Sequence, residues 1–181
     1  PGYYRLDSNI ISFGGDVCIY INASDVILDG LGHLVSGMDK ANTYGVYVYN
    51  ATNVTIRGLI LSGWDRAIYV YNSPKSKIFD NQLFGNTYGV LIELSPQSHI
   101  YNNTVRKNSN GIRIRMSSGA WVYSNRVTGC LYSIYMTSSN HSRVYANVIE
   151  GNGGFWWNGG IVDEKSHNNT IYANIIRNNI G

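Results

Sequence analysis

Residues 89–110 read GVLIELSPQSHIYNNTVRKNSN, and residues 111–132 read GIRIRMSSGAWVYSNRVTGCLY. The second stretch repeats the apolar positions of the first, with Ile112 in place of Val90 and Val122 in place of Ile100. Such a short, fixed period is typical of solenoid proteins. Further copies start near residues 17, 45, 67, 133 and 160. Most copies are 22 residues long, and residues 1–16 form a divergent lead-in.

Three apolar columns emerge when the copies are aligned. The columns contain Val46, Ile68, Val90, Ile112, Ile134 and Ile161; Leu28, Ile56, Ile78, Ile100, Val122, Val144 and Ile171; and Leu61, Leu83, Val105, Val127, Ile149 and Ile176. Short alternating runs separated by Asn, Ser and Gly indicate strands and turns. Three columns that face one axis predict an all-β chain, a single parallel β-helix (solenoid) of about seven coils stacked about 4.8 Å apart.

Asparagines occupy two further columns, at the turns between the strands. One column contains Asn81, Asn103, Asn125, Asn147 and Asn174, and the other contains Asn86, Asn108, Asn152 and Asn179. Asparagine tolerates the left-handed backbone of tight corners. Its amide also donates and accepts hydrogen bonds, so it can bond to the amide one coil away. We therefore expect structural ladders at these corners rather than a binding site.

The composition excludes several classes of protein. Charged residues make up 14% of the chain, against about 25% in a typical domain, and 22 asparagines and 20 glycines dominate instead. The 15 tyrosines argue against disorder. A net charge of +3 without a Lys/Arg run argues against nucleic acid as a partner. No apolar run approaches the roughly 20 residues of a membrane helix.

Several stretches resemble a known family. Residues 1–6 read PGYYRL, residues 24–33 read SDVILDGLGH, and residues 168–172 read NNTIY, a turn and strand that recur in the coils. In these features the chain resembles right-handed parallel β-helix repeat proteins with a pectin-lyase-like fold, among them archaeal cell-surface repeat proteins and a periplasmic copper-maturation factor. The resemblance implies right-handedness and an extracellular or cell-surface location. It leaves the function open, because this fold carries many activities.

The two cysteines and the glycosylation motifs give weaker signals. The alignment places Cys18 in the inward column of Val46 and Cys130 in the corner column of Asn108. A separation of four coils, about 19 Å, is too large for a disulfide. We expect Cys18 to be buried, whereas an exposed Cys130 would allow an interchain bond. Six sequons are candidate glycosylation sites in a secreted chain: Asn22, Asn50, Asn53, Asn102, Asn140 and Asn168.

One acidic pair is a candidate for catalysis or calcium binding. Glycoside hydrolysis commonly needs two carboxylates about 5 to 9.5 Å apart, which on a solenoid must share a corner on neighbouring coils. Asp39 and Asp65 meet this requirement, with Arg66 beside them. We prefer the interpretation that both carboxylates belong to a solvated loop, and we assign no catalytic residue. The four histidines share no column, so we predict neither a metal site nor a cofactor.

The aromatic residues form a more informative pattern. One outward column contains Phe79, Tyr101, Tyr123, Tyr145 and Tyr172. Near the corner where two long copies carry insertions lie Tyr44, Trp64, Tyr88, Tyr132, Phe155, Trp156 and Trp157. Like rings on neighbouring strands stabilise each other, but exposed rings also bind sugars or subunits. Both groups are therefore candidate ligand or subunit contacts.

The ends of the predicted solenoid indicate how the chain could assemble. The last copy is a regular repeat without a cap, and an open solenoid end favours pairing with another chain. We expect a non-enzymatic extracellular β-solenoid that builds a filament, sheath or surface layer through end-to-end and aromatic contacts. Two alternatives stay open: a carbohydrate-binding surface module, and a polysaccharide lyase, hydrolase or epimerase. The expected partners are copies of the chain, a neighbouring surface protein or a polysaccharide.

Overall fold

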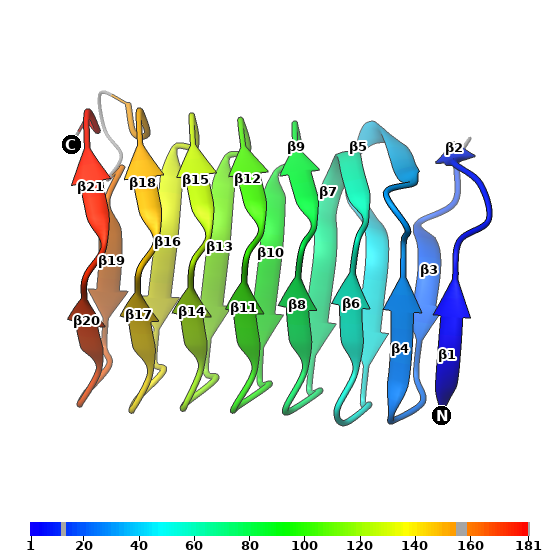
Figure 1. The fold of residues 1–181 in the computed structure, drawn as a ribbon, viewed down its shortest axis with the longest axis horizontal. Helices are drawn as coiled ribbons and strands as arrows, with labels where there is room; N and C mark the ends of the chain where they lie inside the picture. Colours follow the sequence, from blue (N-terminus) through cyan, green and yellow to red (C-terminus); the bar gives the residue numbers. More distant parts are fainter. Residues whose placement is uncertain (12–13, 155–158, 181) are drawn as a thin grey trace.

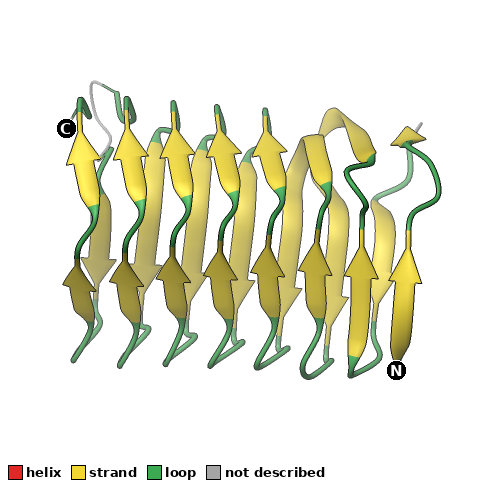
Figure 2. Ribbon diagram, in the orientation of Figure 1, coloured by secondary structure: helices red, strands yellow, loops and turns green. Residues whose placement is uncertain are grey.

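The computed structural model describes residues 1–11, 14–154 and 159–180. These residues form strands stacked along one long axis, with the two termini at opposite ends of the stack (Figure 1). All the strand pairings are parallel, as in β10 with β13 and β11 with β14. The described residues contain no helix (Figure 2). The chain is an all-β parallel solenoid of about seven coils, which confirms the fold predicted from the repeat.

One wall of the solenoid is a sheet of eight strands. In stacking order it contains β1 (Gly2–Arg5), β4 (Val26–Asp29), β6 (Thr55–Arg57), β8 (Lys77–Phe79), β11 (His99–Tyr101), β14 (Trp121–Tyr123), β17 (Arg143–Tyr145) and β20 (Thr170–Tyr172). Equivalent residues of successive coils pair directly, so Ile78 lies beside Ile100 and Ile100 beside Val122. The 22-residue repeat therefore sets the register of this sheet.

The other two walls belong to a sheet of 13 strands, whose arms join in the long strands β5 (Leu34–Tyr49) and β7 (Ile60–Tyr71). The first arm contains β2 (Ile10–Ile11), β9 (Gln82–Phe84), β12 (Thr104–Arg106), β15 (Arg126–Thr128), β18 (Val148–Glu150) and β21 (Ile175–Arg177). The second arm contains β3 (Val17–Ile21), β10 (Tyr88–Glu93), β13 (Asn110–Arg115), β16 (Tyr132–Thr137) and β19 (Ile161–Glu164). The outward side of the second arm, with residues 44–49 and 66–71, is called the long-strand face below.

The three predicted apolar columns form the core. Strand alternation turns Ile68 and Val70 inward, where both are fully buried, and turns Tyr69 between them outward. Burying such a side chain contributes about 1.5–3 kcal/mol, so the columns stabilise every junction between coils. At the last coil the columns become accessible, and Ile171 and Ile176 are 45% and 49% exposed.

The asparagine columns lie buried at two corners. In the first, each amide nitrogen donates to the next amide oxygen at 2.9–3.0 Å, in the order Asn81, Asn103, Asn125, Asn147, Asn174. In the second, Asn86 donates to Asn108 at 3.0 Å and Asn152 donates to Asn179 at 2.9 Å. Cys130 stands between these two pairs, and its N–H donates to Asn152 Oδ1 at 2.9 Å. These contacts link each coil to the next through side chains as well as backbone.

A third corner carries a ladder of serines that was not predicted. The N–H of each serine donates to the hydroxyl oxygen one coil further on, at 2.8–3.0 Å, in the order Ser73, Ser95, Ser117, Ser139, Ser166. The hydroxyls of Ser95 and Ser117 donate in turn to the backbone carbonyls of Glu93 and Arg115. At this corner, serine side chains link each coil to the next by hydrogen bonds, as asparagine side chains do at the other two corners.

The environments of both cysteines differ from the prediction. Ile19 lies opposite Val46, so Ile19 takes the inward column and Cys18 stands beside it, half-buried. The first coil is one residue shorter than the alignment assumed. Cys130 does take the corner position, but it is 1% exposed, and burial raises the pKa of its thiol to about 11. A buried, protonated thiol cannot form an interchain bond at the surface.

The first residues of the chain also form strands of the solenoid. Strand β1 pairs with β4 and β2 pairs with β5. Asp29 joins these first coils, because its Oδ2 accepts hydrogen bonds from Tyr3 Oη and Arg57 Nε, both at 2.9 Å, and its Oδ1 accepts from Leu31 N–H at 3.1 Å. Burial alone raises the pKa of this carboxyl, but the three hydrogen-bond donors outweigh burial and hold the pKa below its usual value.

Candidate functional site

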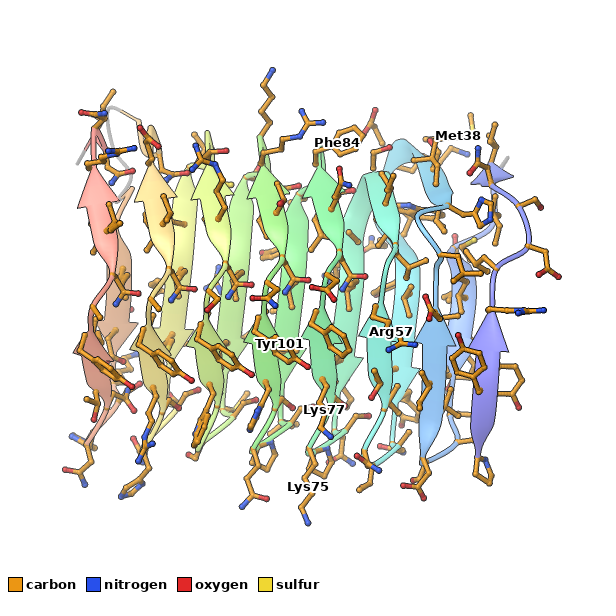
Figure 3. All side chains as sticks on the ribbon, viewed as in Figure 1. Met38, Arg57, Lys75, Lys77, Phe84 and Tyr101 are labelled. Atoms are coloured by element: carbon orange, nitrogen blue, oxygen red, sulfur yellow. The ribbon has the colours of Figure 1, made fainter. Side chains whose placement is uncertain are left out.

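The predicted outward column of rings lies on the eight-stranded sheet. Figure 3 shows Tyr101 within this row and Arg57 towards the N-terminal end. Ring centroids lie 4.7–5.0 Å apart and ring planes are within 3–10° of parallel, in the order Phe79, Tyr101, Tyr123, Tyr145, Tyr172. Arg57 lies over the free side of Phe79 at 6.0 Å. The inner rings of the row are covered on both faces, a cation lies at one end, and Tyr172 at the other end is 47% exposed.

This stacking limits what the row can bind. A ring covered on both faces presents only its edge to solvent, whereas contact with the flat side of a sugar needs an open face. Beside the row, His99 and Arg143 cover the two sides of Trp121, each at 4.9 Å. Each ring pair contributes roughly 0.2–1 kcal/mol to stability. The aromatic residues of the eight-stranded sheet therefore mainly contact one another and stabilise the sheet.

The predicted acidic pair lies at one corner, where Asp39 and Asp65 line a hollow of about 350 Å³. Asp65 Oδ2 accepts a hydrogen bond from Asn42 N–H at 2.9 Å and pairs with Arg66 Nη1 at 3.0 Å. Asp39 is exposed. The contacts of Asp65 position Asn42 and Arg66, so this carboxylate has a structural task in the folded chain.

Trp64 is not a surface contact, and this part of the prediction is wrong. The side chain is 2% exposed, and its Nε1 donates to Val35 O at 3.0 Å. The ring fits beneath Gly37, where an added Cβ would lie 2.7 Å from it. The loop aromatics Phe155, Trp156 and Trp157 lie outside the described residues. Tyr132 is half-buried on the long-strand face.

Six tyrosines gather on the N-terminal half of the long-strand face. This tyrosine patch consists of Tyr20, Tyr44, Tyr47, Tyr49, Tyr69 and Tyr71. Tyr47 lies at its centre and stacks on Tyr44 at 5.0 Å and on Tyr69 at 5.1 Å. Its contacts with Tyr20 and Tyr49 are tilted by 56° and 60°. Tyr20 and Tyr49 are 51% and 36% exposed, so the open ring surface of the patch lies at its edges.

The patch adjoins a hollow of about 130 Å³, which we call the arginine hollow. Its lining residues come from β7, β10 and β13 and are Arg66, Tyr69, Tyr88, Leu91, Glu93, Arg113 and Arg115. The guanidinium of Arg66 lies 5.1 Å from the ring of Tyr44, 5.6 Å from that of Tyr69 and 5.8 Å from that of Tyr88. Arg66 therefore connects the hollow to the tyrosine patch.

Glu93 organises one side of the hollow. Its Oε2 accepts a hydrogen bond from Tyr69 Oη at 3.0 Å, and its Oε1 lies 3.5 Å from Arg115 Nη1. Burial, and then the bond to Glu93, raise the pKa of Tyr69 well above its usual value. The phenol therefore stays protonated at physiological pH, where it serves as a hydrogen-bond donor and not as a base.

Arg113 is the least satisfied cation of the hollow. Its guanidinium lies over the Tyr135 ring at 4.6 Å, and its Nη1 makes a long hydrogen bond of 3.5 Å to Asn110 Oδ1. Its Nε is buried and has no hydrogen-bond partner among the residues that the structure describes. Such an unpaired buried donor is costly, and it marks Arg113 as a group that a ligand can satisfy.

The sequons lie on corners, where five of their asparagines are exposed and Asn140 is half-buried. Asn53 Nδ2 donates to Asp25 Oδ1 at 2.8 Å, and Asn72 Nδ2 donates to Asn50 Oδ1 at 2.7 Å. Glycosylation at these positions stays a prediction. In the described part of the chain, no helix is long and apolar enough to cross a membrane.

A family model described as "Periplasmic copper-binding protein (NosD)" matches residues 19–181. The chain belongs to the NosD family. Membership confirms the predicted resemblance to β-helix repeat proteins, and a periplasmic family is consistent with a cell-envelope or extracellular location. A search of curated proteins gives no match.

Solved structures show the same fold. DFA-IIIase from Arthrobacter chlorophenolicus A6 superposes with a TM-score of 0.76 at 14% identity, over 95% of this chain and 44% of that chain. A double mutant of the periplasmic alginate epimerase AlgG superposes with a TM-score of 0.53 at 14% identity, over 88% of this chain and 60% of that chain. The chain therefore spans less than two thirds of either protein, and at these identities the likeness shows the fold alone.

The NosD description names copper, but the described residues do not fit a copper site. Copper favours imidazole, thiolate and thioether ligands. No group of three His, Cys, Asp or Glu side chains gathers closely enough to hold a metal ion in the described part of the chain. His99 is stacked on Trp121, and the Cys130 thiol is buried and protonated. The His, Cys, Asp and Glu side chains of the described residues thus form no copper ligand set.

The arginine hollow was not predicted from the sequence, although Arg66 was singled out for another reason. Two signals could have indicated it. Arg113 and Arg115 alternate with the inward Ile112 and Ile114, so both must face outward from the same strand. Arg66 shares a column with Tyr88 one coil further on. Together these positions place three arginines on one face, one on β7 and two on β13, with β10 between them.

Proposed function

We propose that the chain is a cell-envelope β-solenoid that binds a polysaccharide along its long-strand face. The observation that carries this proposal is the continuous surface on which the tyrosine patch runs into the arginine hollow through Arg66. This surface crosses β3, β5, β7, β10 and β13, and parallel strands lie about 4.8 Å apart. An extended polymer along the solenoid axis would meet a new set of side chains at every coil.

The chemistry of the patch suits a hydroxylated polymer. Tyrosine combines an apolar ring with a hydroxyl that donates and accepts hydrogen bonds. Tyr20 and Tyr49, at the edges of the patch, are 51% and 36% exposed. In the stack on the eight-stranded sheet, both faces of Tyr101, Tyr123 and Tyr145 are covered by neighbouring rings. The long-strand face is therefore the better carbohydrate surface of the two. AlgG, which shares the fold, is an alginate epimerase.

Affinity electrophoresis through gels that contain dextran or polygalacturonate tests the proposal. We expect wild type to be retarded by at least one polymer, and Tyr47→Ala to weaken binding about tenfold or more, because it removes the centre of the patch. Tyr123→Ala is the matched control, since Tyr123 is held between Tyr101 and Tyr145 on the other sheet. Equal loss of binding in both variants would contradict the placement of the site.

The same samples also show whether the chain only binds the polymer or changes it chemically. The enzyme alternative requires new reducing ends, unsaturated sugars or inverted sugar centres to accumulate with time, and size-exclusion chromatography and NMR of the polymer detect these. We expect bound but unchanged polymer. A time-dependent product that disappears on substitution of a residue of the arginine hollow would favour an enzyme over a binding module.

Self-assembly, expected from the sequence, is the second candidate, through apolar residues that are accessible in the first and last described coils. At the N-terminal end, Tyr4, Ile19, Ile21, Val26 and Leu28 help to line an open hollow of about 360 Å³. At the other end Ile171 and Ile176 are exposed. Two different apolar ends that meet head to tail form open filaments unless rotation closes a ring. Light scattering over a concentration series would show growth of long particles if the ends pair.

A further inference from the structure

We infer that the arginine hollow is an oxyanion subsite, which takes a carboxylate or sulfate group carried by the bound polysaccharide. The inference rests on the proposed function, since it names the class of polymer that the long-strand face selects. It assigns recognition of the acidic substituent to Arg113, with Arg66 and Arg115 as flanking cations. Neutral sugar units would then contact the tyrosine patch.

The charge balance of the hollow leaves one cation over. Arg66 is paired with Asp65 at 3.0 Å, and Arg115 is paired with Glu93 at 3.5 Å. Arg113 forms no ion pair within the described residues. Three guanidinium groups and one carboxylate, Glu93, line the hollow, and Asp65 pairs with Arg66 from outside the lining. The surplus charge therefore belongs to Arg113, whose Nε lacks an acceptor. An oxyanion supplies both the missing negative charge and the missing acceptor.

The geometry of arginine suits this ligand. A guanidinium binds a carboxylate or sulfate through two parallel N–H donors, and such charge-assisted pairs are stronger than neutral hydrogen bonds. In the free chain, the Arg113 guanidinium contacts the face of the Tyr135 ring and makes one long hydrogen bond to Asn110. Its Nε is covered in the free chain, so we expect the guanidinium to turn from the Tyr135 ring toward the hollow when an oxyanion enters.

The size of the hollow supports a substituent and not a whole ligand. Its volume is about 130 Å³, below the roughly 300 Å³ at which small-molecule pockets begin. Water takes up about 30 Å³ per molecule in the liquid, so the hollow has the size of a few waters or one small anionic group. The remainder of the polymer would lie outside it, over the neighbouring tyrosines.

Among the residues that the structure describes, Glu93 is the one carboxylate that lines the hollow, and contacts with its neighbours reduce its repulsion of an anionic ligand. Both oxygens of Glu93 are engaged, one by Tyr69 and the other by Arg115. Leu91 lies between the inward-facing Val90 and Ile92, so it faces outward, yet neighbouring side chains cover it to 5% exposure. An apolar floor lowers the local dielectric and strengthens the attraction between a guanidinium and an oxyanion.

The test compares three polymers and two arginine variants by isothermal titration calorimetry. Polygalacturonate supplies carboxylates, dextran sulfate supplies sulfates, and dextran supplies neither. Arg113→Gln removes the proposed ligand. Arg143→Gln is the matched control, because Arg143 also lies over an aromatic ring, Trp121 at 4.9 Å, but on the other sheet. We expect Arg113→Gln to lose about 10- to 100-fold in affinity for an acidic polymer, the loss of one charge-assisted hydrogen-bonded pair, with dextran binding and Arg143→Gln unchanged.

The outcomes separate the inference from the function on which it rests. If wild type binds dextran as tightly as both acidic polymers, the oxyanion subsite is wrong and polysaccharide binding stands. If both arginine variants lose the same affinity, the attraction is that of net charge and the subsite is again wrong. If no polymer binds, both proposals fail. Comparing polygalacturonate with dextran sulfate shows which oxyanion is preferred.

A measurement on unmodified protein guards against a variant that does not fold. Galacturonate should raise the melting temperature of wild type more than glucose at equal concentration, because only the acid fills the hollow. Arg113→Lys keeps the charge but not the two-donor fork, so its affinity for acidic polymers should fall between those of wild type and Arg113→Gln. Equal melting shifts with galacturonate and glucose would overturn the inference.

Discussion

Replacing Asn125 by leucine removes one amide from the middle of the first asparagine ladder. Asn125 Oδ1 accepts hydrogen bonds from both the backbone N–H and the side-chain amide of Asn103, each at 3.0 Å. Asn125 Nδ2 donates to Ile100 O at 2.9 Å and to Asn147 Oδ1 at 3.0 Å. Leucine has no polar atoms, so the backbone N–H of Asn103 loses its acceptor, whereas Asn103 Nδ2 keeps Ile78 O at 2.9 Å and Tyr101 O at 3.0 Å.

The expected loss follows from the unpaired backbone N–H of Asn103. A buried donor without a partner costs about 1–3 kcal/mol, so we expect the free energy of unfolding to fall by about that amount. In a chain of this length each kcal/mol shifts the melting temperature by about 2–4 °C. Urea unfolding followed by far-UV circular dichroism gives the same quantity as a shift in midpoint, provided that the slope is unchanged.

The neighbouring residue supplies the control. Asn102 is exposed and has a φ of 54°, and one coil further on Ser124 takes the same place with a φ of 54°. Asn102→Ser should therefore change stability by less than about 0.5 kcal/mol. If Asn125→Leu and wild type unfold at the same urea concentration, the ladder does not contribute to stability and the reasoning is refuted.

Two further predictions concern the second ladder and the first coils. Cys130→Asn should stabilise the chain by about 1 kcal/mol, because an amide oxygen replaces the sulfur to which the backbone and side chain of Asn108 bond; an unchanged or lower urea midpoint would contradict this. The lowered pKa of Asp29 contributes stability above the usual pKa of 3.8, which is lost as the pH falls through the folded-state value. Asp29→Asn should therefore be less stable at pH 7 and lose less stability between pH 7 and pH 3 than wild type. Equal midpoint shifts in the two proteins over that range would count against the assignment.

The fold could be predicted from the sequence because its two main determinants repeat at one fixed interval. Inward residues such as Val90 and Ile112 pair directly across coils, and a corner amide such as Asn103 bonds to its counterpart in the next coil. Each signal appears several times in the sequence, so single exceptions do not hide it. Position in the repeat therefore translates directly into position in the solenoid.

The prediction was weakest where the repeat is irregular. Trp64 lies at the corner that joins the arms of the larger sheet, and only the close approach of Gly37 shows that its ring fits inside. Cys18 precedes the first regular coil, where one residue fewer shifts the register. Such deviations depend on the local path of the backbone, which spacing alone does not give.

The candidate site was missed for a different reason. The three arginines of the hollow, Arg66, Arg113 and Arg115, belong to different columns, so they do not form a repeated pattern in the sequence. Their proximity depends on lateral contacts between columns, as in the approach of Arg66 to Tyr44, Tyr69 and Tyr88. A search down each column finds ladders, whereas a site assembled across columns requires the three-dimensional arrangement.

The division between inward and outward positions has an evolutionary consequence. The fold places strict demands on its buried columns and on the amides and hydroxyls of its corners, and few on the residues that face solvent. Mutations can therefore replace the outward-facing residues of one wall, strand by strand, while the buried columns and the corner residues stay unchanged. A chain that is only 14% identical to DFA-IIIase can therefore share its fold, with a TM-score of 0.76. Selection for a new ligand can act on a single wall at little cost to folding.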